Sequence, residues 1–182
     1  SHFNTLGSEL TVCDYRGYGR SEGTPTLRNG LEDAKVIYRH LRGNSKLKSK
    51  VCVMGRSLGS APAIELCVQF PEIACCVIES GYADPIPLVE RRGLRIDKTT
   101  PAEDAMFSNS HKIRLIECPL LIMHGEEDFL IHPQEARLNY ENAGSKHKAL
   151  EILEGVGHND MMMACDNAYF ESLTRFFKEI FV

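Results

Sequence analysis

The chain has 182 residues, of which 43% are apolar and 25% charged, and its formal net charge is −4. This composition excludes a disordered or collagen-like chain, and the length suffices for one domain, residues 1–182, that buries roughly 70% of its unfolded surface. The negative balance provides no broad positive field, so we expect no binding to nucleic acid and no attraction to an anionic membrane surface.

The cysteines and the apolar runs define the expected compartment. Most of the seven cysteines lie inside apolar runs such as ACCVIES, where cysteine behaves as a small hydrophobe, and no Cys-x-x-Cys pair indicates zinc. The longest apolar runs have five or six residues, far below the roughly 20 that span a bilayer, and the first residues do not form a signal peptide. We expect a cytoplasmic protein without a membrane span, a metal or another cofactor.

Short strand-like runs alternate with amphipathic segments of helical length along the whole chain. This alternation predicts an α/β fold with a mostly parallel sheet flanked by helices. Five strands are expected, at 10–15, 51–55, 74–79, 119–124 and 149–154. In the third of these runs the adjacent Cys75 and Cys76 should point to opposite faces of the sheet.

The helices between these runs carry start and stop signals. Thr26 is the expected N-cap of the first helix and Gly43 its stop. The segment 58–70 is apolar nearly all round, which predicts the most buried helix. Pro133 suits the first position of a later helix.

Further along, Gly144 is the expected end of the helix that begins at Pro133, and Asp166 or Asn167 is the expected cap of the last helix. That helix should bury the apolar residues of one face, namely Phe170, Leu173, Phe177 and Ile180. The long interval 81–117 mixes prolines with short helical pieces, and such intervals often lie over a site.

Gly55-Arg56-Ser57-Leu58-Gly59 reads G-x-S-x-G and stands between a strand-like run and the buried helix. At such a turn the glycines leave room for a sharp bend that holds the serine hydroxyl off the sheet, above a helix N-terminus that favours negative charge. A serine hydroxyl is a poor nucleophile at neutral pH, so this interpretation requires a base and an orienting acid later in the chain.

Both partners occur in the expected order, each just after a strand. Asp128 follows the run 119–124 and His158 follows the run 149–154. Parallel sheets place their ligands at the carboxyl ends of their strands, so the three side chains should converge there. Three other carboxylates are alternative acids, namely Glu79, Glu126 and Glu127.

The segments DYRGYGRSEG (14–23), GRSLGS (55–60) and HGEED (124–128) resemble those of the α/β-hydrolases, and the resemblance covers essentially the whole chain. It implies Ser57 as nucleophile, Asp128 as acid and His158 as base in cleavage of a small acyl substrate, a carboxylic ester or thioester. Peptidase and lipase activities stay open as alternatives, because this fold hosts them as well. It also implies that the Leu58 N–H lies in the oxyanion hole and that 81–117 forms a cap. Residues expected at the substrate are Tyr18, Arg56 and Met161.

The resemblance also implies that three strands and one oxyanion loop of the family fold should precede Ser1. One of those strands is central, so its neighbours need a strand rearrangement, missing residues or a partner chain such as a second copy of this one. Without the loop's N–H donor we expect impaired hydrolysis, because one oxyanion donor is typically worth about 10²–10³ in rate.

Other interpretations compete with this one. The spacing of His124, Asp128 and His132 would suit a metal site on a helix, but the local sequence favours a strand end instead, with His132 before the next helix. Asp14 and Arg16 are expected to form an ion pair or loop clamp.

The basic residues of the interval 81–117 suit either an anionic substrate or, more simply, a solvated helix face; they are Arg91, Arg92, Arg95 and Lys98. A second class of function is a non-catalytic binding or assembly module in which the serine, histidine and aspartate persist without activity.

Overall fold

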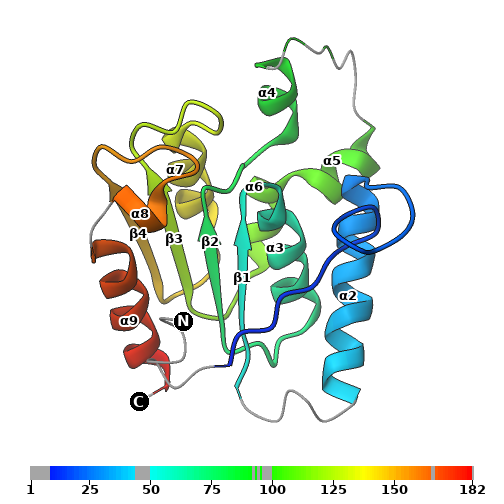
Figure 1. Ribbon diagram of the computed structural model, residues 1–182, viewed down its shortest axis with the longest axis horizontal. Coiled ribbons are helices and arrows are strands. Elements are labelled where there is room, and N and C mark those ends of the chain that lie inside the picture. Colours follow the sequence, from blue (N-terminus) through cyan, green and yellow to red (C-terminus); the bar gives the residue numbers. More distant parts are fainter. Residues whose placement is uncertain are drawn as a thin grey trace.

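The computed structural model describes residues 9–43, 50–91, 93, 95, 100–164 and 167–181. Its centre is a parallel sheet of four strands, β1 (Cys52–Arg56), β2 (Cys75–Glu79), β3 (Leu120–Gly125) and β4 (Lys148–Leu153). The strands lie side by side in chain order, so all four carboxyl ends meet at one edge of the sheet (Figure 1). Four of the five predicted strands are therefore confirmed.

The strand predicted at 10–15 is wrong. Residues 9–15 form no regular secondary structure, and the side chains of Leu10 and Val12 are 53% and 79% exposed. A strand is stable only when a neighbour satisfies its backbone N–H and C=O groups, and this segment does not pair with the sheet. An apolar alternating run was thus insufficient to make a strand.

Alternating side chains of the strands build two separate cores. Cys76 and Ile78 of β2 face one cluster, while Cys75 and Val77 face the other, as the two-residue period of a strand predicts. The first cluster packs against α2 (Leu27–Gly43), α3 (Ser60–Gln69) and α7 (Pro133–Asn142), and the second against α9 (Ala168–Phe181). The result is a three-layer arrangement of helices, sheet and helix (Figure 1). Every residue of β2 and β3 is buried, because both faces of these strands are covered.

Most of the predicted helix starts and ends agree with the helices of the structure. The hydroxyl of Thr26 accepts a hydrogen bond from the N–H of Asn29 at 3.0 Å, and α2 ends at Gly43. Seven of the ten residues of α3 are buried, which confirms it as a deeply packed helix. Pro133 opens α7, which ends at Asn142, two residues before Gly144.

The last helix, α9, starts at Ala168 and buries one apolar face. Leu173 is fully buried, and Phe170, Phe177 and Ile180 are partly buried against the same cluster. The N–H of Glu171 donates to the Asn167 carbonyl at 2.9 Å. The alternative cap, Asp166, lies outside the described residues.

The described residues of the interval 81–117 form four short elements, α4 (Pro85–Glu90), α5 (Pro101–Phe107), α6 (Asn109–Lys112) and the 3₁₀ turn η2 (Ile113–Leu115). Helix α4 stands beyond the carboxyl edge of the sheet (Figure 1). The base of the interval is fastened by polar contacts: the hydroxyls of Ser108 and Ser110 donate to Asp84 at 2.5 and 2.8 Å. That this interval serves as a cap remains a prediction.

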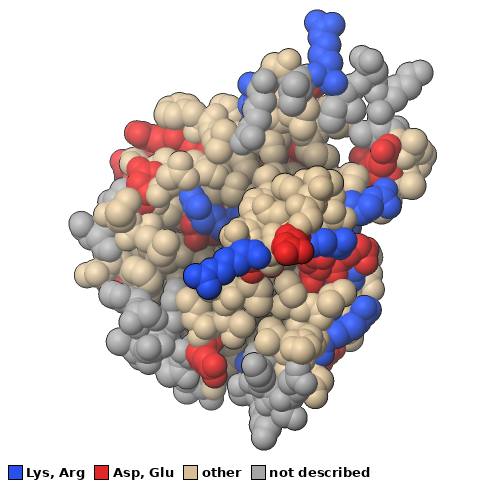
Figure 2. Space-filling view, turned by 45° about the vertical axis from the view of Figure 1, so that its right-hand side comes forward, with Lys and Arg blue, Asp and Glu red and all other residues tan. Residues whose placement is uncertain are grey.

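Several basic side chains on the surface form ion pairs. The guanidinium of Arg16 lies 2.6 Å from Asp33 on α2, so the expected pair with Asp14 is wrong; Asp14 accepts instead from the N–H of Arg20. Arg91 pairs with Glu135 of α7. On the face in Figure 2 basic and acidic groups are interspersed among uncharged ones. Arg92 and Lys98 lie outside the described residues.

Among the described helices, none combines the length and the apolar character that crossing a bilayer requires.

The packing of α9 on the sheet is tested by Leu173→Ala. Leu173 is fully buried in the second cluster. Its truncation should lower the free energy of unfolding by about 2–5 kcal/mol, measured by urea denaturation, because it leaves a cavity. Leu138→Ala on α7 is the matched control, since that leucine is 38% exposed. An equal loss in both variants would contradict the assignment of α9 to the core.

Candidate active site

Ser57 occupies a sharp turn at the carboxyl end of β1. The strand ends at Arg56, the 3₁₀ turn η1 (Ser57–Gly59) follows, and α3 begins at Ser60. Ser57 has φ +54°, a left-handed conformation that non-glycine residues rarely adopt and that costs free energy. The surrounding strand and helix impose it, and the turn carries the hydroxyl away from the sheet.

The two glycines of the motif have different roles. A Cβ on Gly55 would lie 2.3 Å from the Gly59 carbonyl oxygen and 2.6 Å from Cβ of Ala63, so only glycine lets β1 and α3 approach this closely. At Gly59, by contrast, a Cβ would meet no described atom within 4 Å, and φ is −66°. The sequence suggested that both glycines make room for the bend, and the structure assigns that need to Gly55.

A chain of short hydrogen bonds joins Ser57, His158 and Asp128, the Ser–His–Asp cluster. Nε2 of His158 lies 3.0 Å from Oγ of Ser57, and Nδ1 lies 2.7 Å from Oδ2 of Asp128. An ionised carboxylate only accepts hydrogen bonds, so Nδ1 carries the proton. In the neutral imidazole, Nε2 then carries the lone pair that can accept from the serine hydroxyl, which is the arrangement that a general base requires.

Asp128 is almost fully buried, 1% exposed, yet it remains ionised. Burial raises its pKa and is the largest single effect. Hydrogen bonds from His124, from the backbone N–H of Ile131 and from His158 together outweigh it and lower the pKa from 3.8 to about 2. The other oxygen, Oδ1, accepts from the N–H groups of Leu130 and Ile131 at 2.9 and 2.8 Å. These donors fix the carboxylate in orientation as well as in charge.

His124 lies behind the acid and is fully buried at the end of β3, as the sequence predicted. Its Nε2 faces two acceptors, the Ile131 carbonyl at 2.7 Å and Oδ2 of Asp128 at 3.2 Å, so this nitrogen carries a proton. His132 is the N-cap residue of α7. The described residues contain no group of three or more potential ligands that could hold a metal ion.

The alternative acid Glu79 contacts Arg56 and Tyr169. This carboxylate, 2% exposed, lies 3.0 Å from Nε of Arg56 and accepts from the Tyr169 hydroxyl at 2.8 Å. The other two alternatives, Glu126 and Glu127, are exposed. Asp128 is the carboxylate that contacts His158.

The remaining predicted site residues differ in position. Leu58 follows Ser57 in η1 and is 46% exposed. Tyr18 is half-exposed on the turn before α2, and its place at the substrate stays a prediction. Met161, the first residue of α8 (Met161–Ala164), is 1% exposed, and its sulfur accepts from the Ser80 hydroxyl at 3.1 Å. It therefore packs in the second core cluster.

Arg56 contacts the loop that carries His158. Its Nη2 donates to the His158 carbonyl at 2.6 Å and to Oδ1 of Asn159 at 2.9 Å. The sequence placed Arg56 at the substrate and did not single out Asn159 or Tyr169. No spacing pattern could have found these partners, because they are brought together from distant segments.

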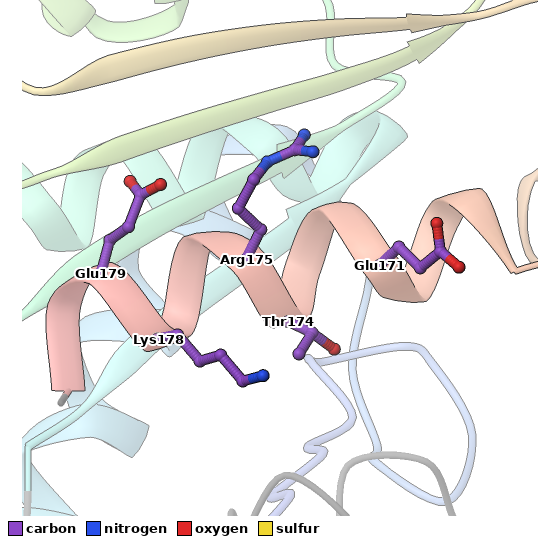
Figure 3. A pocket seen from close by; sticks show the side chains of 5 residues that line it. All are labelled: Glu171, Thr174, Arg175, Lys178 and Glu179. Atoms are coloured by element: carbon purple, nitrogen blue, oxygen red, sulfur yellow. The ribbon is translucent and has the colours of Figure 1, made fainter.

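Two surface hollows lie apart from this cluster. One, of about 460 Å³, lies along α9, where Arg175 reaches toward the strands (Figure 3). Its lining residues all come from that helix: Glu171, Thr174, Arg175, Lys178 and Glu179. A second, of about 250 Å³, lies beside the end of α3. Neither hollow is lined by Ser57, Asp128 or His158.

Comparisons with known proteins agree with the geometry. The family described as serine aminopeptidase, S33 matches residues 77–162. Alpha/beta hydrolase domain-containing protein 17B of Homo sapiens is 32% identical over 181 residues, which cover 97% of this chain and 60% of that protein. Alpha/beta hydrolase domain-containing protein aho-3 of Caenorhabditis elegans is 30% identical over 176 residues, which cover 94% of this chain and 49% of that protein. Over nearly its whole length, the chain is thus similar in sequence to α/β-hydrolase domain-containing proteins.

Solved structures of two hydrolases share the fold. The Pyrococcus furiosus esterase Pf2001 aligns with a TM-score of 0.83 at 20% identity, covering all of this chain and 73% of the esterase. A Pyrococcus horikoshii acylaminoacyl peptidase aligns with a TM-score of 0.70 at 16% identity, covering 88% of this chain and 30% of the peptidase. The chain spans about 60% of the length of the human relative.

The different roles of the two motif glycines are tested by Gly55→Ala and Gly59→Ala. The first should lower the free energy of unfolding by about 1–3 kcal/mol, because a methyl group there overlaps α3. The second has open space and should change stability by less than about 0.5 kcal/mol. Denaturant unfolding of both variants measures the difference, and equal effects would contradict the assignment.

The low pKa of Asp128 predicts a pH-dependent contribution to stability. Because folding lowers this pKa from 3.8 to about 2, the contribution is present above about pH 4 and is lost as the pH falls toward 2. The stability advantage of the unmodified chain over Asp128→Asn should shrink by about 2 kcal/mol across this window. Urea unfolding between about pH 5 and pH 2 measures it. Glu126→Gln, which removes an exposed carboxylate from the same turn, is the control; the same loss there would contradict the prediction.

Proposed function

We propose that the chain is a serine hydrolase that cleaves a carboxylic ester or thioester through an acyl-enzyme. The observation that carries the proposal is the 3.0 Å contact between Nε2 of His158 and Oγ of Ser57, with Asp128 behind the imidazole at 2.7 Å. These residues lie on three separate loops at one sheet edge. A non-catalytic module would not need a strained serine aligned with a base and an acid.

Each member of the cluster has a step in the proposed reaction. Oγ of Ser57 attacks the substrate carbonyl while Nε2 of His158 takes the hydroxyl proton, and the imidazolium then passes that proton to the leaving alkoxide or thiolate. Water, deprotonated by the same nitrogen, attacks the acyl-enzyme; the bond to Oγ breaks, the imidazolium returns the proton to Oγ, and the carboxylic acid leaves. The backbone N–H of Leu58 is the proposed donor to the oxyanion.

The electrostatics of the acid support this sequence of steps. A carboxylate with a pKa of about 2 remains ionised at neutral pH, so Asp128 keeps the Nδ1 proton in place and stabilises the imidazolium that forms. Its two backbone donors leave Oδ2 directed at His158. The neutral imidazole is thus held in the tautomer whose Nε2 can accept the Ser57 proton.

The choice of an ester or thioester rests on the attacking group and on the similar proteins. A serine–histidine pair suits acyl transfer, and the structural neighbours include esterases. The six described cysteines are free thiols, which supports a reducing compartment and hence our proposal that the protein acts in the cytoplasm.

A fluorophosphonate probe tests the proposed function. The activated hydroxyl of Ser57 should form a covalent phosphonyl adduct, detected by intact mass and peptide mapping. Ser57→Ala should abolish labelling, and Asp128→Asn should slow it by about 10³-fold or more, because the imidazole loses its orienting acid.

Ser21→Ala is the control, since this hydroxyl donates to the Asp14 carbonyl in a turn outside the cluster. It should label at the unmodified rate. If the unmodified chain forms no adduct at Ser57, the proposed hydrolase function is wrong and the binding-module interpretation is favoured.

A further inference from the structure

The loop that carries His158 has to cross the sheet edge to reach Ser57. Ser57 follows β1 and the histidine follows β4, and these strands are the two ends of the sheet. With neighbouring strands about 4.8 Å apart, three steps separate them by about 14 Å. A loop that extends this far needs stabilising contacts near its tip, because a 1 Å displacement of a reacting group can cost about 10²-fold in rate.

Arg56 provides contacts at that tip. Its Nη2 donates to the carbonyl of His158 itself at 2.6 Å and to the side chain of Asn159 at 2.9 Å. Arg56 is also the residue directly before Ser57. One side chain therefore links the backbone of the nucleophile to the backbone of the base.

A second nitrogen of the same guanidinium is anchored in the core. Its Nε lies 3.0 Å from Glu79 at the end of β2, and Glu79 accepts from the Tyr169 hydroxyl of α9. Glu79 and Tyr169 are 2% and 1% exposed. Arg56 of β1 thus contacts β2 and the loop after β4 directly, and α9 through Glu79. Because Glu79 and Tyr169 are buried, they cannot move without disturbing the core.

We propose that Arg56 is a positioning residue, whose guanidinium holds the His158 loop against the Glu79–Tyr169 anchor so that Nε2 stays within hydrogen-bond reach of Ser57. The proposal rests on the proposed function and replaces our expectation that Arg56 binds substrate. Two of its three guanidinium nitrogens bind the protein, Nε at Glu79 and Nη2 at the His158 loop. An arginine fork can make both contacts together, whereas a lysine ammonium is a single point donor.

The variant Arg56→Lys tests whether Arg56 positions the His158 loop or only forms an ion pair with Glu79. Lysine keeps a positive charge for Glu79, so the midpoint of thermal unfolding should stay within about 3 °C of the unmodified protein. The rate of fluorophosphonate labelling at Ser57 should nevertheless fall about tenfold to 100-fold, because the loop is no longer fastened. Arg114→Lys is the matched control, since Arg114 makes a two-nitrogen contact with Asn142 away from the cluster.

Steady-state kinetics distinguish positioning from substrate binding. With 4-nitrophenyl acetate, which is neutral, and 4-nitrophenyl hemisuccinate, which is anionic, positioning by Arg56 predicts the same fall in kcat and little change in KM for both esters in Arg56→Lys. Substrate binding by Arg56 predicts a rise in KM for the anionic ester alone, and that result would overturn the proposal. Added guanidinium should restore part of the labelling rate of Arg56→Gly.

Hydrogen–deuterium exchange separates failure of this inference from failure of the proposed function. Amides of residues 154–160 should exchange about tenfold faster in Arg56→Lys and at the unmodified rate in Arg114→Lys, whether or not the chain labels with the probe. If the unmodified chain does not react with the probe but exchange of residues 154–160 is faster in Arg56→Lys, the proposed hydrolase function is wrong and the positioning role of Arg56 is supported. If Arg56→Lys shows the exchange and the labelling rate of the unmodified chain, the positioning role of Arg56 is overturned and the proposed hydrolase function is unaffected.

Discussion

The arrangement of the site depends on one topological constraint, the parallel alignment of four strands in chain order. It brings the ends of β1, β3 and β4 to the same edge, so residues separated by up to 101 positions can share a chain of hydrogen bonds. The same constraint creates the main difficulty, since the serine and the histidine follow opposite ends of the sheet. The loop after β4 must bridge the sheet edge, and its contacts with Arg56 meet that requirement.

Two buried carboxylates near this edge have different partners and therefore different roles. Asp128 accepts from two backbone N–H groups and faces two histidines, which keeps it charged and aligned with His158. Glu79 instead meets a guanidinium and a phenol, Arg56 and Tyr169, which join the sheet to α9. A buried charge needs such compensation to be tolerated, so the identity of the compensating donors decides what each carboxylate does.

Much of this could be predicted from the sequence because it is locally encoded. The apolar runs of β2 and β3, the Thr26 cap and the Pro133 start depend on neighbours within a few residues, and all are present in the structure. The segment 10–15 failed because a strand also needs a partner, which no local pattern supplies. The order of Ser57, Asp128 and His158 relative to the strands predicted their convergence, because strand ends in a parallel sheet lie on one edge.

The sequence by itself therefore determined the fold class, the glycine-flanked serine turn and the candidate serine, acid and base. Only the tertiary structure decided which carboxylate contacts His158, which glycine the turn requires, and what Arg56 and Met161 touch. Arg56 meets a loop more than 100 positions away, and Met161 lies in the core rather than on the surface. Such contacts depend on how separate elements pack against one another, and that packing is not encoded in the spacing of residues along the chain.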